Sequence, residues 1–318
     1  MIIIKFNSVI DGHCDTLTVI ESQNRTLGDY SQVGQLDLPR MRSAGVNVQL
    51  FAIFINPKDK DVALKKCLYY IDKFYRELYQ NSGIIEPALS GEDLFRITSG
   101  GKIAAVLSIE GGECISGNLA VLRVLYRLGV RSLTLTWNAR NELGDGVGEG
   151  VTGGGLSKFG RSVVGEMNHL GMLIDVAHLS EKGFWHVAET SSQPFAATHA
   201  NCRAICNHPR NLNDEQIKYL AKTGGMLGLT FVPEFIADKR PGLDTLLLHV
   251  DHIASIAGTK CIGLGSDFDG MEIPAQGLED VNCIPVIAEA LFKRGYSNDD
   301  ISDIMGGNWL RLLKHVLK

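Results

Sequence analysis

The sequence predicts a (β/α)8 TIM barrel, in which eight parallel strands form a closed cylinder inside a ring of helices. Eight short segments rich in apolar and β-branched residues alternate with segments of helical spacing. Most of the strand segments are continuous apolar runs, which is typical of parallel strands covered on both faces. The alternation spans about 270 residues, the size expected of such a barrel.

The expected strands are residues 8–13, 46–54, 103–110, 132–137, 173–178, 195–199, 225–231 and 261–267, and the clearest helices are 61–80, 118–128, 213–222 and 243–257. Gly129, Gly171 and Gly224 each follow a helical segment, where a left-handed residue can end a helix. A doubly wound open sheet is the alternative, but no G-x-G-x-x-G follows the first strand. No domain boundary is visible, so residues 1–318 are expected to form one domain.

The composition indicates a globular protein with a small substrate. The chain has 318 residues, 45% of them hydrophobic, and a net charge of -5 from 31 Lys and Arg against 36 Asp and Glu. This apolar content is sufficient for a buried core and excludes a disordered or fibrous protein. Basic residues form no block longer than two, so we expect neither nucleic acid nor an anionic membrane as a partner.

The cysteines and the N-terminus indicate a cytoplasmic protein. Seven cysteines are scattered without a C-x-x-C pair, which predicts buried thiols rather than a disulfide framework. The apolar run at the N-terminus is interrupted by Lys5 and lacks the length and cleavage site of a signal peptide. No segment approaches the length of a membrane span.

Potential metal ligands or proton carriers lie at the ends of five predicted strands. In such a barrel the active site is formed where the strands end, so these positions are the most informative. The six residues are His13, Asp15, Glu110, His178, His199 and Asp267. A single histidine at a strand end is most often a hydrogen-bonded core residue, but an ionised carboxylate in an apolar strand is costly unless it is paired or bound to metal. All six together favour a metal centre, whereas the other six histidines are expected to be structural.

The spacing of these residues suits two cations. His13 and Asp15 lie two residues apart on an extended chain, so their side chains share a face and can bind one ion. His178 and His199, from neighbouring strands, can bind a second. The two oxygens of Glu110 can bridge ions separated by roughly 3.5 to 4 Å. Imidazole and carboxylate ligands are typical of zinc or a similar divalent cation.

Seven ordered motifs resemble those of the membrane (renal) dipeptidase family, the M19 metallopeptidases of the amidohydrolase superfamily. They are DGHCDT near the start, SIEGGE at 108–113, LTLTWN at 133–138, GMLIDVAHLS at 171–180, THANCRAICNHPRN at 198–211, GLGSDFDG at 263–270 and GGNWLR at 306–311. The resemblance implies that His13 and Asp15 bind one zinc, that His178 and His199 bind the other, and that Glu110 bridges them. It further implies that Asp267 carries the proton and that Arg210 binds the C-terminal carboxylate of a dipeptide. A homodimer is also implied.

One position departs from the family pattern. Many members carry a histidine near the scissile carbonyl where this chain has Trp137, and an indole N–H can donate one hydrogen bond but cannot ionise. Trp137 and the following Asn138 are candidate substrate-binding residues. No lysine lies between 103 and 157, which disfavours relatives with a carboxylated lysine bridge. The glycine-rich segment 144–155 lacks the G-K-[ST] ending of a phosphate loop and is expected to be a mobile loop.

The predicted reaction is hydrolysis of a dipeptide by hydroxide that two divalent cations generate near neutral pH. Asp267 takes the proton from water and passes it to the leaving amine. Arg210 binds the substrate carboxylate, and the resemblance allows a D-residue at that end. The alternatives are a related amidohydrolase acting on N-acyl amino acids or lactams, and a barrel that binds metal without turnover.

Overall fold

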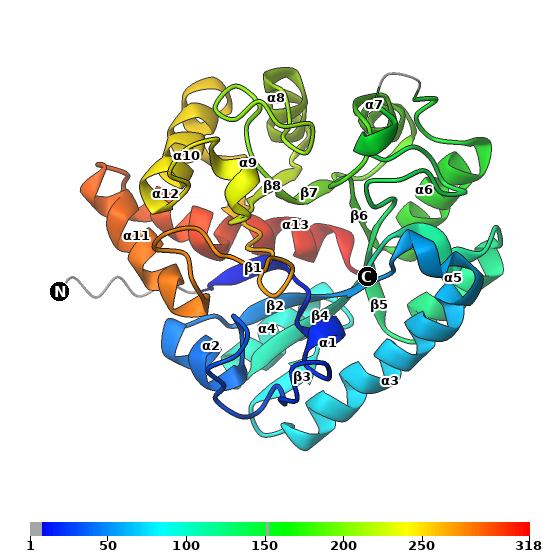
Figure 1. Ribbon diagram of the computed structural model, residues 1–318, viewed down its shortest axis with the longest axis horizontal. Coiled ribbons are helices and arrows are strands. Elements are labelled where there is room, and N and C mark those ends of the chain that lie inside the picture. Colours follow the sequence, from blue (N-terminus) through cyan, green and yellow to red (C-terminus); the bar gives the residue numbers. More distant parts are fainter. Residues whose placement is uncertain (1–7, 151–152) are drawn as a thin grey trace.

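The computed structural model describes residues 8–150 and 153–318 and confirms the predicted (β/α)8 barrel (Figure 1). The strands of the cylinder are β1 (Ile10–Cys14), β2 (Val48–Phe54), β4 (Ile103–Glu110), β5 (Val130–Thr134), β6 (Leu173–Asp175), β7 (Ala196–Ala200), β8 (Met226–Leu229) and β9 (Ile262–Leu264). Each pairs in parallel with the next, and β1 pairs with both β2 and β9, which closes the barrel. All eight strands overlap the predicted segments, and β4 has the predicted bounds.

One further strand, β3 (Ile85–Pro87), was not predicted from the sequence. It pairs with the first residues of β4, where Ile85 lies opposite Ile103, while the later residues of β4 pair with β5. The strand has only three residues and ends at a proline, so it lacks the apolar run on which the other strands were recognised. It extends the sheet outside the cylinder and leaves the barrel order unchanged.

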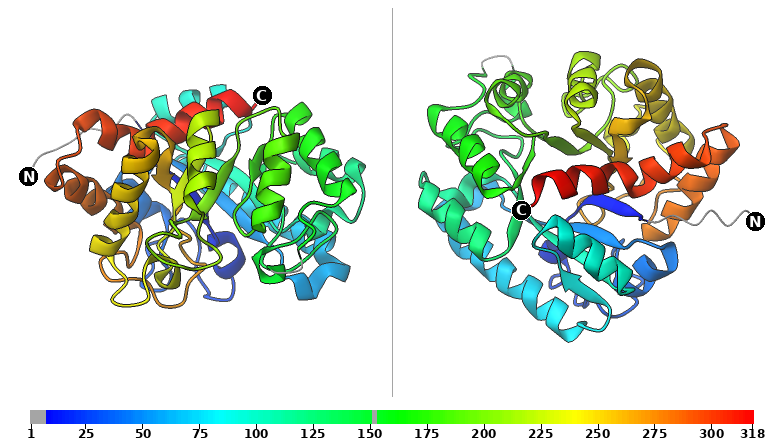
Figure 2. Two further views of the ribbon diagram at one scale, coloured as in Figure 1. Left: turned by 90° about the horizontal axis from the view of Figure 1, so that it is seen from above. Right: turned by 180° about the vertical axis from the view of Figure 1, so that it is seen from behind.

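The helices surround the barrel, except the last one, which crosses one end (Figure 2). They are α1 (Thr16–Val19), α2 (Leu38–Ala44), α3 (Ala63–Gln80), α4 (Gly91–Ser99), α5 (Leu119–Arg127), α6 (Lys158–Leu170), α7 (Glu181–Thr190), α8 (Asp214–Thr223), α9 (Pro233–Ile236), α10 (Leu243–Ala257), α11 (Ile284–Lys293), α12 (Asn298–Ser302) and α13 (Asn308–Val316). The four predicted helices correspond to α3, α5, α8 and α10. Gly171 and Gly224 cap α6 and α8 with left-handed φ angles of 77° and 80°, as predicted.

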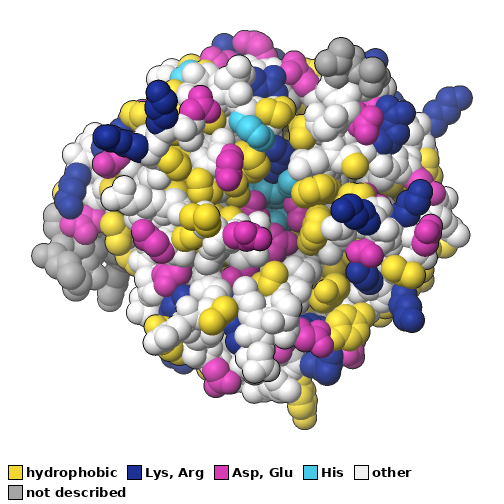
Figure 3. All heavy atoms as spheres, in the orientation of Figure 1, with side chains coloured by type: hydrophobic (Ala, Val, Ile, Leu, Met, Phe, Trp, Pro, Cys, Tyr) yellow, Lys and Arg dark blue, Asp and Glu magenta, His cyan; other side chains and the backbone are white. Residues whose placement is uncertain are grey.

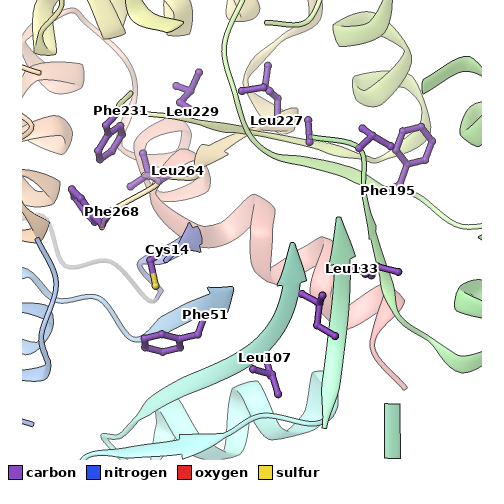
Figure 4. Close-up of a cluster of buried hydrophobic side chains, with 14 of the residues drawn as sticks. Cys14, Phe51, Leu107, Leu133, Phe195, Leu227, Leu229, Phe231, Leu264 and Phe268 are labelled. Carbon is purple, nitrogen blue, oxygen red and sulfur yellow. The ribbon is translucent and has the colours of Figure 1, made fainter. Parts of the chain in front are cut away.

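The main core lies between the barrel wall and the helices (Figure 4). Side chains such as Phe51, Leu107 and Leu133 leave the strands outward and are buried there. All seven cysteines are buried and unpaired, as expected. Among the described residues, the longest and most apolar helices still fall short of what a membrane crossing needs.

The C-terminal helix α13 lies across one end of the barrel, as the rear view shows (Figure 2). Its Trp309 is fully buried, and the indole N–H donates a 2.8 Å hydrogen bond to the carbonyl of Leu264. The ring fills the space beside Gly12 and Gly263, where a Cβ atom would come within 2.5 Å of it. Because β1 and β9 both begin at this end, α13 closes the base, and the strand ends at the opposite face are left for the functional site.

Candidate metal centre

The six predicted residues meet at the face where the strands end. His13 lies in β1 and His199 in β7, whereas Glu110 is the last residue of β4. His178 and Asp267 lie three residues beyond β6 and β9, although the sequence placed both inside strands. Their φ angles of 65° and 66° are left-handed, which a β-strand does not allow, so these two predicted strand ends were wrong.

Glu110 lies between two groups of donor atoms. On one side, the Nε2 atom of His13 is 3.8 Å from Glu110 Oε2 and 3.5 Å from Asp15 Oδ2. On the other side, Glu110 Oε1 is 2.8 Å from His178 Nε2 and 3.3 Å from His199 Nε2. The two carboxylate oxygens therefore face different ligand sets, which is the arrangement of a bridging ligand.

The donor atoms fit divalent cations. His13 Nε2 and Asp15 Oδ1 are buried and have no hydrogen-bond partner. The Nε2 atoms of His178 and His199 face each other at 2.8 Å, so their lone pairs repel unless a proton or a cation lies beside them. Three overlapping sets of these side chains place one donor atom each within 4.8 Å of the others. Imidazole and carboxylate donors at such spacing are the ligands of zinc and related metals.

Neighbouring side chains orient the two histidines on the second side. His178 Nδ1 is 2.7 Å from the side-chain oxygen of Asn138, which can only accept, so Nδ1 donates and Nε2 is free for a metal. His199 Nδ1 is 2.9 Å from Thr198 Oγ1, and that hydroxyl donates to Asp175 Oδ2 at 2.6 Å. His199 Nδ1 must therefore donate as well. Asn138, predicted as a substrate-binding residue, thus contacts a predicted metal ligand.

Two fully buried carboxylates beneath the centre, Asp175 and Asp11, were not predicted from the sequence. Asp175 accepts hydrogen bonds from the backbone N–H groups of Ala177 and Thr198, besides the Thr198 hydroxyl. Asp11 accepts from the backbone and the hydroxyl of Ser266. Both are acidic residues inside predicted apolar strands, a pattern that could have indicated them, but only the residues at predicted strand ends were considered.

Burial and mutual repulsion shift the titration of the site. Burial opposes the charge on His13, yet Glu110, Asp15 and Asp267 outweigh it and raise the pKa of His13 to about 10. Burial raises the pKa of Glu110 to about 7 and also raises that of Asp267. In the protein alone His13 therefore holds a proton near neutral pH and Glu110 is partly protonated, and binding of a cation would displace these protons.

Arg210 and Trp137 flank the centre. Arg210 is 3% exposed, donates from one terminal nitrogen to the carbonyl of His199 at 3.0 Å, and has a buried Nε without a partner. Burial lowers its pKa to about 10, against the pull of Asp267 and Glu110, so it stays charged near pH 7. The centroids of the Trp137 and Phe54 rings are 5.4 Å apart, and Phe54 was not predicted as a site residue.

The surface is hollowed at this face, and histidine and acidic side chains are visible in the hollow near its centre (Figure 3). A closed barrel with acidic and imidazole groups at its strand ends and a buried arginine beside them defines a metal-dependent hydrolase of the amidohydrolase type. Residues 2–318 match the family model of the membrane dipeptidases, peptidase family M19. The chain belongs to this family of metallopeptidases, as the motifs predicted.

Relatives of known name agree with this assignment. Dipeptidase aclJ of Aspergillus oryzae is 33% identical over 297 residues, which cover 89% of this chain and 70% of that protein. The structure of dipeptidase AC, an M19 metallopeptidase, superimposes with a TM-score of 0.92 at 30% identity and covers 98% of this chain and 99% of that one. A Rhodobacter sphaeroides metallopeptidase bound to a phosphinate mimic of L-Ala-D-Ala gives a TM-score of 0.91 at 29% identity, covering 98% and 100%.

Proposed function

We propose that this metallopeptidase is a zinc-dependent dipeptidase that hydrolyses small dipeptides with a free C-terminal carboxylate. The observation that carries the proposal is the position of Glu110, whose two oxygens face His13 on one side and His178 with His199 on the other. A single carboxylate placed in this way has the geometry to hold two cations side by side.

Each half of the centre has its own ligands in this proposal. His13 and Asp15 would hold one cation, His178 and His199 would hold the second, and Glu110 would contribute a carboxylate oxygen to each. When bound, two divalent cations supply a polarising charge for the scissile carbonyl and lower the pKa of water. Asn138 and Thr198 keep the Nε2 atoms of the two histidines on the second side free to bind.

Asp267 is the proposed proton carrier. Its Oδ1 atom lies 3.7 Å from His13 Nε2, at the edge of the donor cluster. Burial raises its pKa above the ordinary value, which brings the carboxyl closer to the range where it can both accept and release a proton. It would first accept a proton from the attacking water and then deliver that proton to the leaving amine.

Arg210 is the proposed receptor for the substrate carboxylate. The guanidinium has an unpartnered Nε, and a guanidinium fork matches the two oxygens of a carboxylate. Phe54 and Trp137 form an aromatic wall beyond His178, which the N-terminal side chain of the dipeptide would contact. The relative bound to a mimic of L-Ala-D-Ala supports a D-residue at the C-terminal end.

The test combines metal analysis with a substrate panel. Purified protein is assayed for bound metals and then, loaded with zinc, against L-Xaa-L-Xaa and L-Xaa-D-Xaa dipeptides and N-acyl amino acids. We expect two equivalents of zinc and hydrolysis of dipeptides. Turnover of N-acyl amino acids without dipeptide hydrolysis would overturn the proposal. The cytoplasmic location and the homodimer stay predictions from the sequence.

A further inference from the structure

Asp267 has an unusual backbone conformation. Its φ angle of 66° is in the left-handed region, which residues other than glycine rarely adopt. Such a conformation persists only where the surroundings impose it. The residues before and after it in the chain, Ser266 and Phe268, are fully buried, so their contacts can impose this conformation on Asp267.

The contacts lead to Asp11. Asp11 Oδ1 accepts a 2.7 Å hydrogen bond from the backbone N–H of Ser266, and Asp11 Oδ2 accepts a 2.6 Å hydrogen bond from the Ser266 hydroxyl. The oxygen of that hydroxyl accepts in turn from the backbone N–H of Phe268 at 3.1 Å. The residues before and after Asp267 are thus both fixed by one carboxylate and one hydroxyl.

We propose that Asp11 is a positioning residue for Asp267: acting through Ser266, it holds the Asp267 carboxylate beside the metal centre in the pose that proton transfer requires. The inference rests on the proposed function of Asp267. Asp11 itself lies two residues before His13 on β1, so one carboxylate ties the strand that bears a predicted metal ligand to the loop that bears the proton carrier.

The backbone provides only part of this connection. Among the described residues, the pairing register of β1 and β9 contains one pair, Asp11 opposite Leu264, and β9 ends at Leu264. Beyond that point Asp267 N donates to the carbonyl of His13 at 3.2 Å, and Asp15 N donates to the carbonyl of Phe268 at 2.8 Å. The two short hydrogen bonds from Ser266 to the side chain of Asp11 act directly beside Asp267, so they hold the loop where it turns.

The experiment uses the zinc-loaded enzyme and a dipeptide that the wild type hydrolyses. Ser266→Ala removes the hydroxyl with almost no change of volume, Asp11→Asn replaces one acceptor oxygen with an amide donor, and the double variant joins both changes. Gln49→Met is the matched control, because Gln49 also donates to Asp11 Oδ2, at 3.0 Å, but has no hydrogen bond to the loop of Asp267. For each variant kcat, KM, zinc content and Tm are measured.

We expect Ser266→Ala and Asp11→Asn each to lower kcat by roughly 10- to 100-fold, since a displacement of about 1 Å in a catalytic group has effects of that size. KM and zinc content should stay at the wild-type values, and Gln49→Met should keep kcat. The double variant should be no slower than the slower single variant, because both changes break one connection. A purely structural role would lower Tm without this split between kcat and KM.

Three results would overturn the inference. The first is an unchanged kcat in Ser266→Ala, a variant that tests the proposal even if Asp11→Asn does not fold. The second is a double variant whose loss is the product of the single losses, which would mean that the two residues act independently. The third is a loss of zinc in parallel with kcat, which would place the effect at His13. An unchanged kcat in Asp267→Asn would instead refute the proposed function itself.

Discussion

Thr198 provides the sharpest test of how the centre is held. Its hydroxyl lies between Asp175 Oδ2, at 2.6 Å, and His199 Nδ1, at 2.9 Å. Thr198→Val keeps the shape of the side chain and removes this oxygen. His199 Nδ1 then has no partner. The tautomer with the proton on Nε2 becomes accessible, and in that tautomer Nε2 has no lone pair to bind a metal.

The size of the effect can be worked from these contacts. If the two tautomers become equally populated, only half of the molecules are competent, which weakens binding about twofold. Loss of the fixed ring orientation and of the basicity that the hydrogen bond confers adds to this. Loss of such an outer partner typically weakens metal binding about 10- to 100-fold, or about 1.4 to 2.7 kcal/mol.

Thr134→Val is the matched control. Thr134 is also fully buried and its hydroxyl also donates to Asp175 Oδ2, but it has no hydrogen bond to His199. Both variants leave the carboxylate with one partner fewer, at a cost of about 1 to 3 kcal/mol in stability. Tm should therefore fall in both, whereas zinc affinity, measured by competition with a chelator, should fall only in Thr198→Val. Equal zinc affinities in the two variants would refute the reasoning.

Three further predictions concern proton transfer, substrate binding and stability. Asp267→Asn should keep its zinc and lose roughly 10²- to 10⁴-fold in turnover, and an unchanged kcat would contradict its role. Arg210→Ala should raise KM for dipeptides but not for amides that lack a free carboxylate; an equal loss on both would indicate a structural role. His249 is buried between the N–H of Cys202 and the carbonyl of Ile236, and burial lowers its pKa to about 4. Because the unfolded chain takes up this proton near pH 6.5, stability is complete above that pH and falls by about 3 kcal/mol towards pH 4. In urea unfolding of the metal-free protein, the difference in unfolding free energy between wild type and His249→Gln should shrink by that amount as the pH falls from about 6.5 to about 4. A difference that does not change with pH would exclude this histidine as the cause.

The sequence was sufficient for the barrel because its strands lie in apolar runs, even where the strand itself has only three residues, as in β6 and β9. β4 is eight residues without a polar break before Ser108, and its predicted bounds are those observed. β3, with three residues and a proline, carries no comparable pattern and depends on its partner strand for its existence. Such tertiary contacts are not encoded in local spacing.

The site was predicted residue by residue, but its geometry was not. The five metal ligands and the proton carrier were predicted as a set because polar residues at strand ends are unexpected in an apolar barrel. The left-handed turns at His178 and Asp267 were missed, because they are imposed by contacts such as that of Ser266 with Asp11. Asp175 was missed because the predicted strand continued to His178, whereas β6 ends at Asp175, where the carboxylate accepts from Thr198.

The closure of the barrel base by α13 has a consequence for the order of events in turnover. With α13 across the base of the barrel (Figure 2) and Trp309 buried against β9, substrate and both products must pass through the opening at the strand ends. The released amino acid that keeps its carboxylate on Arg210 would occupy the path of the next substrate until it departs. Free amino acids of the kind released at that end should therefore act as competitive inhibitors of the dipeptide. The higher their affinity for the site, the lower the product concentration at which turnover slows.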